Sequence, residues 1–200
     1  LKINQQLLMN QQKMLENQQK ILNEVEYIDP LDGKKIGFEF NPVSFLFASA
    51  DNQITFSGGI SFFTISKTAE IAFPIYSRSG DDGFSLNQID CHYRIFLGKY
   101  RNGFYISSGI RHISIEGKED NSYFDLFGIG PTSDNILKIS KSGLTFGIGY
   151  RIFGKNGWYW GASIFGGRYL DKSDVKIKSA PAAHSEGIID MEFFKIGRLF

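Results

Sequence analysis

The chain contains little of several residue types that mark other classes of protein. Its 200 residues include one cysteine, Cys91, so an intrachain disulfide is excluded and a thiolate metal cluster is not expected. Lys and Arg number 22 and Asp and Glu 21, so there is no one-sided charge to recruit nucleic acid. No segment approaches the ~18 uninterrupted apolar residues of a membrane-spanning helix. These absences argue against a disulfide scaffold, a nucleic-acid-binding protein and a helical membrane protein.

The abundant residues favour strands. Aromatic residues make up 15% of the chain, with 19 Phe against 2 Trp, and there are 22 glycines. This mixture is typical of β-strands joined by tight turns. The sequence begins with Leu1 rather than Met and shows no secretory signal, so we expect a processed or trimmed form.

Residues 1–26 form a first, Asn- and Gln-rich part. Apolar pairs recur every seven residues, at Leu7 and Leu8, Met14 and Leu15, and Ile21 and Leu22. This spacing predicts a short heptad-like helix, which would be either a self-associating coiled-coil stalk or a flexible arm. Residues 27–33 contain turn-forming Asp, Pro and Gly and are predicted to be a linker, which leaves 34–200 as the second part.

The apolar period changes to two from residue 34 onward. The clearest alternation sets Leu144, Phe146 and Ile148 against Thr145 and Gly147. Eight such segments are predicted as strands, at 36–47, 54–62, 69–75, 89–97, 104–117, 144–152, 158–164 and 188–200. Pro42 and Pro74 interrupt two of them, so bulges or bends are expected there.

The polar face of these segments carries small residues such as Gly59, Ser61 and Gly147, with a few long charges. Small polar residues suit the narrow interior of an eight-stranded barrel with lipid outside, whereas a soluble ligand-binding barrel needs an apolar interior. Every second connection is tight and the others are longer, up to about 118–138. Outer-membrane barrels alternate short periplasmic turns with longer external loops in this way. Both termini are then expected on the periplasmic side.

Aromatic residues gather at the short-turn end of the predicted strands. Rings at the headgroup level are typical of membrane barrels. The residues expected at this interface are Tyr100, Phe104, Tyr105, Phe153, Trp158, Tyr159, Trp160 and Phe200. The sequence ends on Phe200, and a C-terminal aromatic strand is what the barrel-assembly machinery of bacterial outer membranes reads. Arg198 shares the alternation of Phe200 and Ile196, where an apolar residue is expected.

The chain resembles the small eight-stranded bacterial outer-membrane barrels of the OmpA-transmembrane and OmpX kind. The segments Gly103–Gly117, Gly143–Gly167 and Phe194–Phe200 carry the resemblance, which covers about 34–200. It implies an all-β, antiparallel, up-and-down transmembrane barrel in the outer membrane of a Gram-negative envelope. It also implies contacts with outer-membrane lipid, lipopolysaccharide and the assembly machinery.

Charged residues of both signs fall on the predicted inner face. They are Glu39, Glu70, Asp90, His92, Arg94, Arg111 and Arg151. Unpaired charges in a confined interior are costly, so we expect them to pair with one another. The paired set would either plug the barrel or line a narrow, porin-like path for ions or small solutes.

One arrangement suggests an enzyme. His112, Ser114 and Glu116 share a face of one strand, and lipid A deacylases are outer-membrane barrels that use His, Ser and Glu facing the membrane. Neighbours on such a face lie ~6.5 to 7 Å apart, too far for direct hydrogen bonds without rotamer reach, and Ile115 stands where that family has Asn.

We therefore expect a protein without enzymatic activity, cofactor or metal, with an envelope-structural or surface-interaction role. The aromatic residues Tyr123, Phe124 and Phe127 in the longest connection would suit a surface contact. The alternatives are a small pore, a lipid A-modifying hydrolase and a soluble ligand-binding barrel. Self-association through residues 1–26 is a further expectation, and no nucleic-acid partner is expected.

Overall fold

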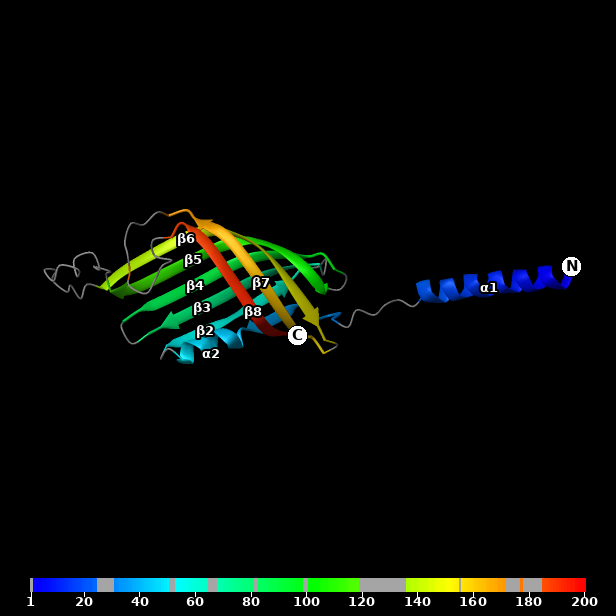
Figure 1. Cartoon of the computed structure of the whole chain (residues 1–200), viewed down its shortest axis with the longest axis horizontal. Helices are drawn as coiled ribbons and strands as arrows, with labels where there is room; N and C mark the ends of the chain where they lie inside the picture. The colour runs from blue at the N-terminus through cyan, green and yellow to red at the C-terminus, as the bar shows by residue number, and fades with distance from the viewer. Residues whose placement is uncertain are drawn as a thin grey trace.

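The structure, a computed structural model, describes residues 2–24, 31–50, 53–64, 68–80, 83–98, 101–118, 136–154, 156–171, 177 and 185–200. Eight antiparallel strands follow one another around a closed barrel, and the last pairs with the first (Figure 1). The strands are β1 (Ile36–Phe40), β2 (Ile54–Phe63), β3 (Ala69–Ser79), β4 (Ser85–Phe96), β5 (Gly103–Lys118), β6 (Ile136–Phe153), β7 (Trp158–Tyr169) and β8 (Gly187–Leu199). The predicted up-and-down barrel is confirmed.

The helix α1 (Lys2–Glu24) precedes the barrel, as the heptad-like spacing predicts. The side chains described in it, those of residues 5–18, are all exposed. Leu8 and Leu15 are each 62% exposed, so nothing within the described residues covers the apolar positions of this helix. Residues 25–30, which hold most of the predicted linker, lie outside the described residues. Among those that are described, no helix is long and apolar enough to cross a membrane.

The short strand β1 gives way to a second helix, α2 (Pro42–Ala50), where the sequence predicts a bent continuation of the strand. Asn41 is the N-cap, because its Oδ1 accepts hydrogen bonds from the backbone N–H groups of Val43 (3.1 Å) and Ser44 (3.4 Å). Pro42 follows at the first helical position, where its missing N–H costs nothing. The Asn-Pro pair therefore ends the strand and begins a helix, which corrects the predicted bulge.

Two other strand irregularities differ from expectation. β3 passes through Pro74 with its register to β4 unchanged, since Ala72 pairs with His92 and Ile75 with Ile89. The register shift lies instead in β8, between the pairs Gly161–Lys195 and Ser163–Glu192. Phe194, at the bulge, has a φ of 58°. One extra residue there reverses the alternation, so that Phe193 and Phe194 both face outward.

The two faces of the barrel wall differ sharply in character. Large apolar side chains cover the outer face on all eight strands; Phe146, for example, is 63% exposed. They include Phe38, Phe56, Phe73, Tyr93, Ile95, Ile106, Ile110, Ile148, Ile164, Phe193 and Ile196. The inner face carries buried Ser, Thr, Glu, Asp, Arg and Lys side chains. This is the inside-out arrangement of a barrel that contacts lipid.

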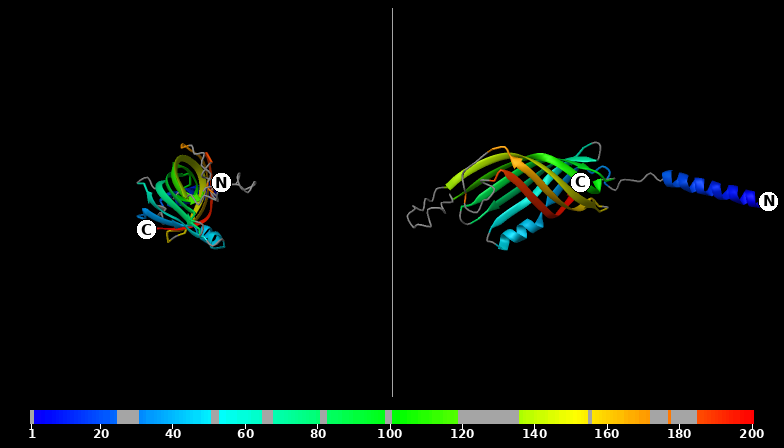
Figure 2. Two further views of the ribbon diagram at one scale, coloured as in Figure 1. Left: turned by 90° about the vertical axis from the view of Figure 1, so that its left-hand side faces the viewer. Right: turned by 45° about the horizontal axis from the view of Figure 1, so that its top comes forward.

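An apolar cluster lies at each end of the interior, which the expectation of a wholly polar lumen did not include. At the end where β8 finishes, the near end, the cluster comprises Leu31, Phe63, Phe96, Tyr105, Tyr159 and Leu199. At the opposite, far end it comprises Phe84, Ile113, Ile115, Tyr169, Ile177 and Ile188. Figure 2 shows the barrel from two further directions. The polar interior is thus a layer between two apolar ends.

Candidate functional site

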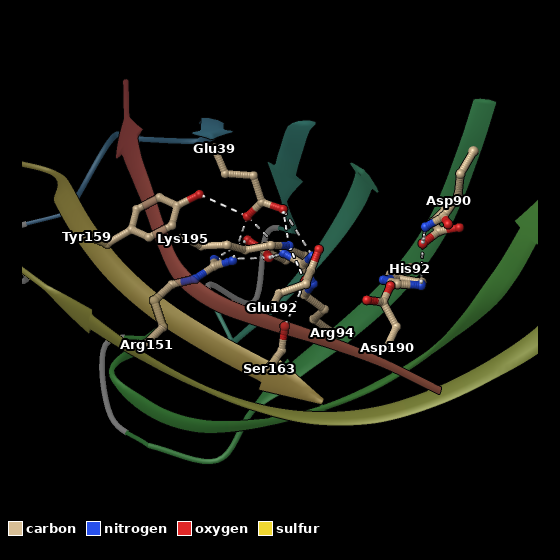
Figure 3. Close-up of polar contacts among 12 residues, drawn as sticks. Glu39, Asp90, His92, Arg94, Arg151, Tyr159, Ser163, Asp190, Glu192 and Lys195 are labelled. Carbon is tan, nitrogen blue, oxygen red and sulfur yellow. Dashed lines mark hydrogen bonds and ion pairs between the residues drawn. The ribbon is translucent and has the colours of Figure 1, made fainter. Parts of the chain in front are cut away.

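A buried group of charged side chains and one tyrosine spans the interior next to the near-end cluster, on its far-end side. We call it the Glu39 cluster: Glu39, Glu70, Arg94, Arg151, Tyr159 and Lys195, from β1, β3, β4, β6, β7 and β8. Figure 3 labels all of these residues except Glu70. All six are buried, and Glu70 and Arg94 have no exposed surface. Alternation along each strand directs these side chains inward, so the cluster joins six of the eight strands across the lumen.

Glu39 is the centre of this cluster. Its carboxylate accepts hydrogen bonds from Arg94 Nη2 (3.2 Å), Arg151 Nη2 (3.2 Å), Lys195 Nζ (3.0 Å) and the Tyr159 hydroxyl (3.2 Å). Both arginines also donate to Glu70, at 2.8 Å from Arg94 and 3.0 Å from Arg151. Each carboxylate therefore neutralises cations from several strands, which offsets the cost of burying them.

Aromatic rings enclose the two arginines of the Glu39 cluster. The Arg151 guanidinium lies 4.3 Å from the ring centroid of Tyr159 and 5.3 Å from that of Phe96. The Arg94 guanidinium lies 5.6 Å from the ring of Tyr105. These rings belong to the near-end cluster, so charge and ring packing together fill the lumen at this level.

A second group lies further toward the far end. We call it the Asp90 cluster: Asp90, His92, Arg111 and Asp190. Arg111 donates to Asp90 through Nε (2.9 Å) and Nη2 (2.8 Å), and Nη2 also donates to Asp190 at 2.7 Å. His92 Nε2 lies 3.2 Å from the Thr145 hydroxyl, and its ring packs on Phe165 at 4.7 Å between centroids.

The seven charged residues predicted for the lumen all lie on the inner face, divided between these two clusters. Sequence reasoning missed Lys195, Asp190 and Glu192. Lys195 occupies an inner position of the simple alternation of β8 and was detectable from it. Asp190 and Glu192 share the parity of Ile196 and Phe200, so they turn inward only because of the bulge at Phe194. Nothing in the sequence predicts that bulge.

The aromatic residues expected at the membrane interface divide into two sets. Phe104, Trp158, Trp160 and Phe200 are exposed on the outer face. Arg198 stacks beside them, with its guanidinium 5.4 Å from the Trp158 ring and 4.9 Å from the Phe200 ring. An arginine at this apolar position thus covers aromatic surface with its long side chain. Tyr100 lies outside the described residues.

Tyr159 and Tyr105 correct the interface prediction, because both side chains are buried inside the barrel. Each inward ring lies over an inward glycine on the neighbouring strand: Tyr159 pairs with Gly197 and Tyr105 with Gly149. A Cβ atom on either glycine would overlap the ring. The glycines therefore make room for rings that fill the lumen. Phe153, half-buried, packs against the same near-end cluster.

His112, Ser114 and Glu116 share one face of β5, as predicted, and that face is the outer one, but the three side chains are not joined to one another. Within the described residues, the hydrogen-bond partner of His112 is Ser142 on β6, with 3.0 Å between Nδ1 and Oγ. Ser114 pairs with Ser140 and Glu116 with Lys138 in the β5–β6 register. The structure does not bring the three side chains together as a triad. Among the described residues, no group of His, Cys, Asp and Glu is arranged to hold a metal ion.

The fold and the site define the class of protein, a closed eight-stranded antiparallel barrel with an apolar exterior and a charged interior. The N-terminal β-barrel domain of Pseudomonas aeruginosa OprF is a similar solved structure, with 18% sequence identity and a TM-score of 0.46. The match covers 84% of this chain and 98% of that domain. No protein-family model and no curated protein matches the chain.

Proposed function

We propose that the chain is an integral outer-membrane β-barrel with an envelope-structural or surface-interaction role and a lumen plugged by side chains. The observation that carries the membrane location is the exterior. Exposed apolar residues on every strand form a surface far larger than soluble monomers expose. A closed barrel also satisfies the backbone hydrogen bonds that lipid cannot.

The Glu39 cluster supports a plugged lumen. Its ion pairs cross the lumen from β4 to β1 and from β6 to β3, and the near-end cluster adds aromatic rings next to them. Such a layer of charged and aromatic side chains across the near end favours a plugged lumen over an open path. An eight-stranded barrel is narrow enough for its side chains to fill in this way.

Membrane extraction tests the proposed location. We expect the protein to stay in the outer-membrane fraction after high-salt and alkaline washes and to be released by detergent, because its exterior is apolar. Release by either wash without detergent would contradict the proposal and favour a soluble barrel. Protection of α1 from protease added to intact cells would support the proposed periplasmic side of the N-terminus.

Planar bilayers test the plug. We expect no single-channel conductance from the wild type, and none from the control Ile110→Ala, which changes only the outer face. Steady wild-type conductance that changes in Arg94→Ala or Arg111→Ala would contradict the plug and favour the alternative of a narrow pore. Absence of conductance from all four proteins would exclude the alternative of a pore.

The partners follow from the same proposal. Lipid and lipopolysaccharide would contact the apolar wall, and the assembly machinery would handle the terminal strand β8. Self-association would involve α1, whose apolar positions are exposed. The aromatic residues Tyr123, Phe124 and Phe127, which we propose for surface contact, lie outside the described residues.

A further inference from the structure

The barrel wall has a lateral interruption between β2 and β8. β1 pairs with β2 at residues 58–62 and with β8 at residues 196–199, and it ends at Phe40. Residues 54–57 of β2 and 187–195 of β8 therefore have no strand between them. Within the described residues, only the backbone N–H of Asn41 bridges from the end of β1 to β2, donating to the Ser57 carbonyl at 2.9 Å.

The helix α2 lies across this interruption. It contacts both β2 and β8, and Figure 1 shows it beside β2, along the barrel wall. Its outward side chains are apolar, with Phe45 52% and Leu46 67% exposed. A helix satisfies its own backbone groups, so it can face lipid where a strand is missing. The helix adds no ladder of backbone hydrogen bonds between β2 and β8. Separating these two strands should therefore cost less free energy than separating any other neighbouring pair.

A cavity of about 450 Å³ lies directly behind the interruption. Asn41, Ser44 and Ser57 line it at the interruption, and Arg111, Asp190 and Glu192 line it deeper in the lumen. The apolar clusters limit access along the barrel axis: Phe84, Ile115 and Ile177 pack at the far end, and the Glu39 cluster with the rings beneath it fills the near end. At the interruption the cavity is separated from the outside by α2 and by no strand, so the side past α2 is the route that we consider.

The cavity lining combines apolar and polar side chains. Ile75, Ile189 and Met191 lie at the wall, where their side chains reach the exposed outer face. Inside, beside buried apolar residues, two lining carboxylates, Asp190 and Glu192, stand against one lining guanidinium. An amphiphile, with a polar head and an apolar chain, matches this mixed lining.

The carboxylates favour a cationic head. Arg111 is shared between Asp190 and Asp90, so it does not neutralise both. Glu192 forms an ion pair with Lys195 at 2.5 Å and accepts a hydrogen bond from the Ser163 hydroxyl at 2.8 Å. Asp190 is 30% exposed, and among the described residues only one of its oxygens has a hydrogen-bond donor.

One further cation lies near the edge of the cavity. Lys141 is held there by the Ser185 carbonyl at 3.2 Å and by the Tyr169 ring at 5.6 Å. With this ammonium already engaged, Asp190 is the group in the lining with room for an added donor.

The geometry points to a binding site for a single-chain amphiphile with an ammonium head, entered sideways from the membrane between β2 and β8. The head lies against Asp190 in the cavity, and the chain passes α2 into the lipid beside Ile189. The inference rests on the proposed membrane location, because only lipid outside the interruption would supply such a molecule. It adds a ligand class and a route that a purely structural barrel would not have.

The test uses spin-labelled dodecylamine and the full-length protein in uncharged maltoside micelles. We expect an immobilised component in the electron paramagnetic resonance spectrum, and an apparent affinity about tenfold or more lower in Asp190→Asn, because the variant loses the charge-assisted contact. Arg111 keeps Asp90 as its partner in this variant. The matched control is Glu116→Gln, which removes a carboxylate from the outer face of β5 and should bind like the wild type.

Two further measurements test the charge of the head group and the entry route independently. Spin-labelled dodecanoic acid should show no immobilised component, and equal immobilisation of acid and amine would overturn the ammonium site. Ser44→Trp should block the side opening and abolish binding, whereas Ile110→Trp, elsewhere on the outer wall, should not. Undiminished binding in Ser44→Trp or in Asp190→Asn would overturn the inference. Absence of binding to a detergent-extracted, membrane-located wild type would overturn it and leave the proposed function intact.

Discussion

Glu39 is the residue on which the interior depends most. Four donors from β4, β6, β7 and β8 converge on its one carboxylate. Glu39 is also the only carboxylate bound to both Lys195 and the arginines among the described residues of the Glu39 cluster. A single side chain on the shortest strand thus holds together cations that would otherwise repel one another across the lumen.

Glu39→Gln is expected to destabilise the barrel by roughly 3–5 kcal/mol, because it leaves buried cations without their counter-charge. Urea unfolding in micelles, followed by tryptophan fluorescence, measures the change. Glu116→Gln is the matched control, and a loss within about 0.5 kcal/mol is expected for this outer-face position. Equal stability of the two variants would show that the Glu39 cluster does not hold the barrel together.

The Ser and His residues on the outer face permit a direct check of the enzymatic alternative. Because His112 contacts Ser142 rather than Ser114, both Ser114→Ala and Ser142→Ala must be made. We expect the acylation of lipid A in cells, read by mass spectrometry, to be the same with wild type, either variant or no protein. A difference between wild type and Ser142→Ala would reinstate a hydrolase.

At the scale of strands and helices, alternation identified all eight strands and the side of the wall that holds the charges. It succeeded because the side-chain period of a strand is fixed by its backbone. It failed where one residue changes the backbone path. Pro42 begins a helix after Asn41, and Phe194 shifts the parity of β8, so that Asp190 and Glu192 move inside.

The direction of the tyrosines could not be predicted from residue type. Aromatic rings suit the headgroup level, but Tyr105 and Tyr159 occupy inner positions opposite glycines. Their direction follows from the alternation of their own strands, because Tyr105 shares the parity of Arg111 and Tyr159 that of Ser163. What the local pattern does not show is the cross-strand register that places a glycine opposite each ring.

Gly197→Ala should therefore disturb the Glu39 cluster from a distance. The added methyl group would displace the Tyr159 ring and break its hydrogen bond to Glu39, at a cost of about 1–3 kcal/mol. Urea unfolding measures the loss. Gly166→Ala, where a Cβ atom has ample room, is the control. If the two variants unfold alike, the ring does not depend on this glycine.

The N-cap of α2 offers a milder perturbation of the wall. Asn41→Ala removes both side-chain hydrogen bonds to the first turn and should cost about 1 kcal/mol. Asn41→Asp retains the capping oxygen and serves as the control. The expected readout is a lower urea midpoint for Asn41→Ala alone, and a larger loss for Asn41→Asp would contradict the capping role.

At the scale of the whole molecule, an exposed helix precedes the closed barrel. The heptad spacing of α1 and the exposure of Leu8 and Leu15 favour a coiled coil between copies. We expect light scattering in micelles to give an oligomer for the wild type and a monomer for Leu8→Gln/Leu15→Gln. Gln11→Ala/Gln12→Ala, between the apolar pairs, should remain oligomeric. A monomeric wild type would favour a flexible arm.

The unequal lengths of the strands also imply an order of events in time. β6 and β7 are joined by residues 154–157 alone, and they pair from Phe153–Tyr159 to Gly143–Tyr169. The seam between β1 and β8 has only five residues on one side and joins Phe38 to Arg198. Closing so long a loop for so few hydrogen bonds is entropically unfavourable until the strands between are in place. The β6–β7 hairpin should form early and the seam last, so a newly made barrel would pass through a stage in which its two terminal strands are still unpaired.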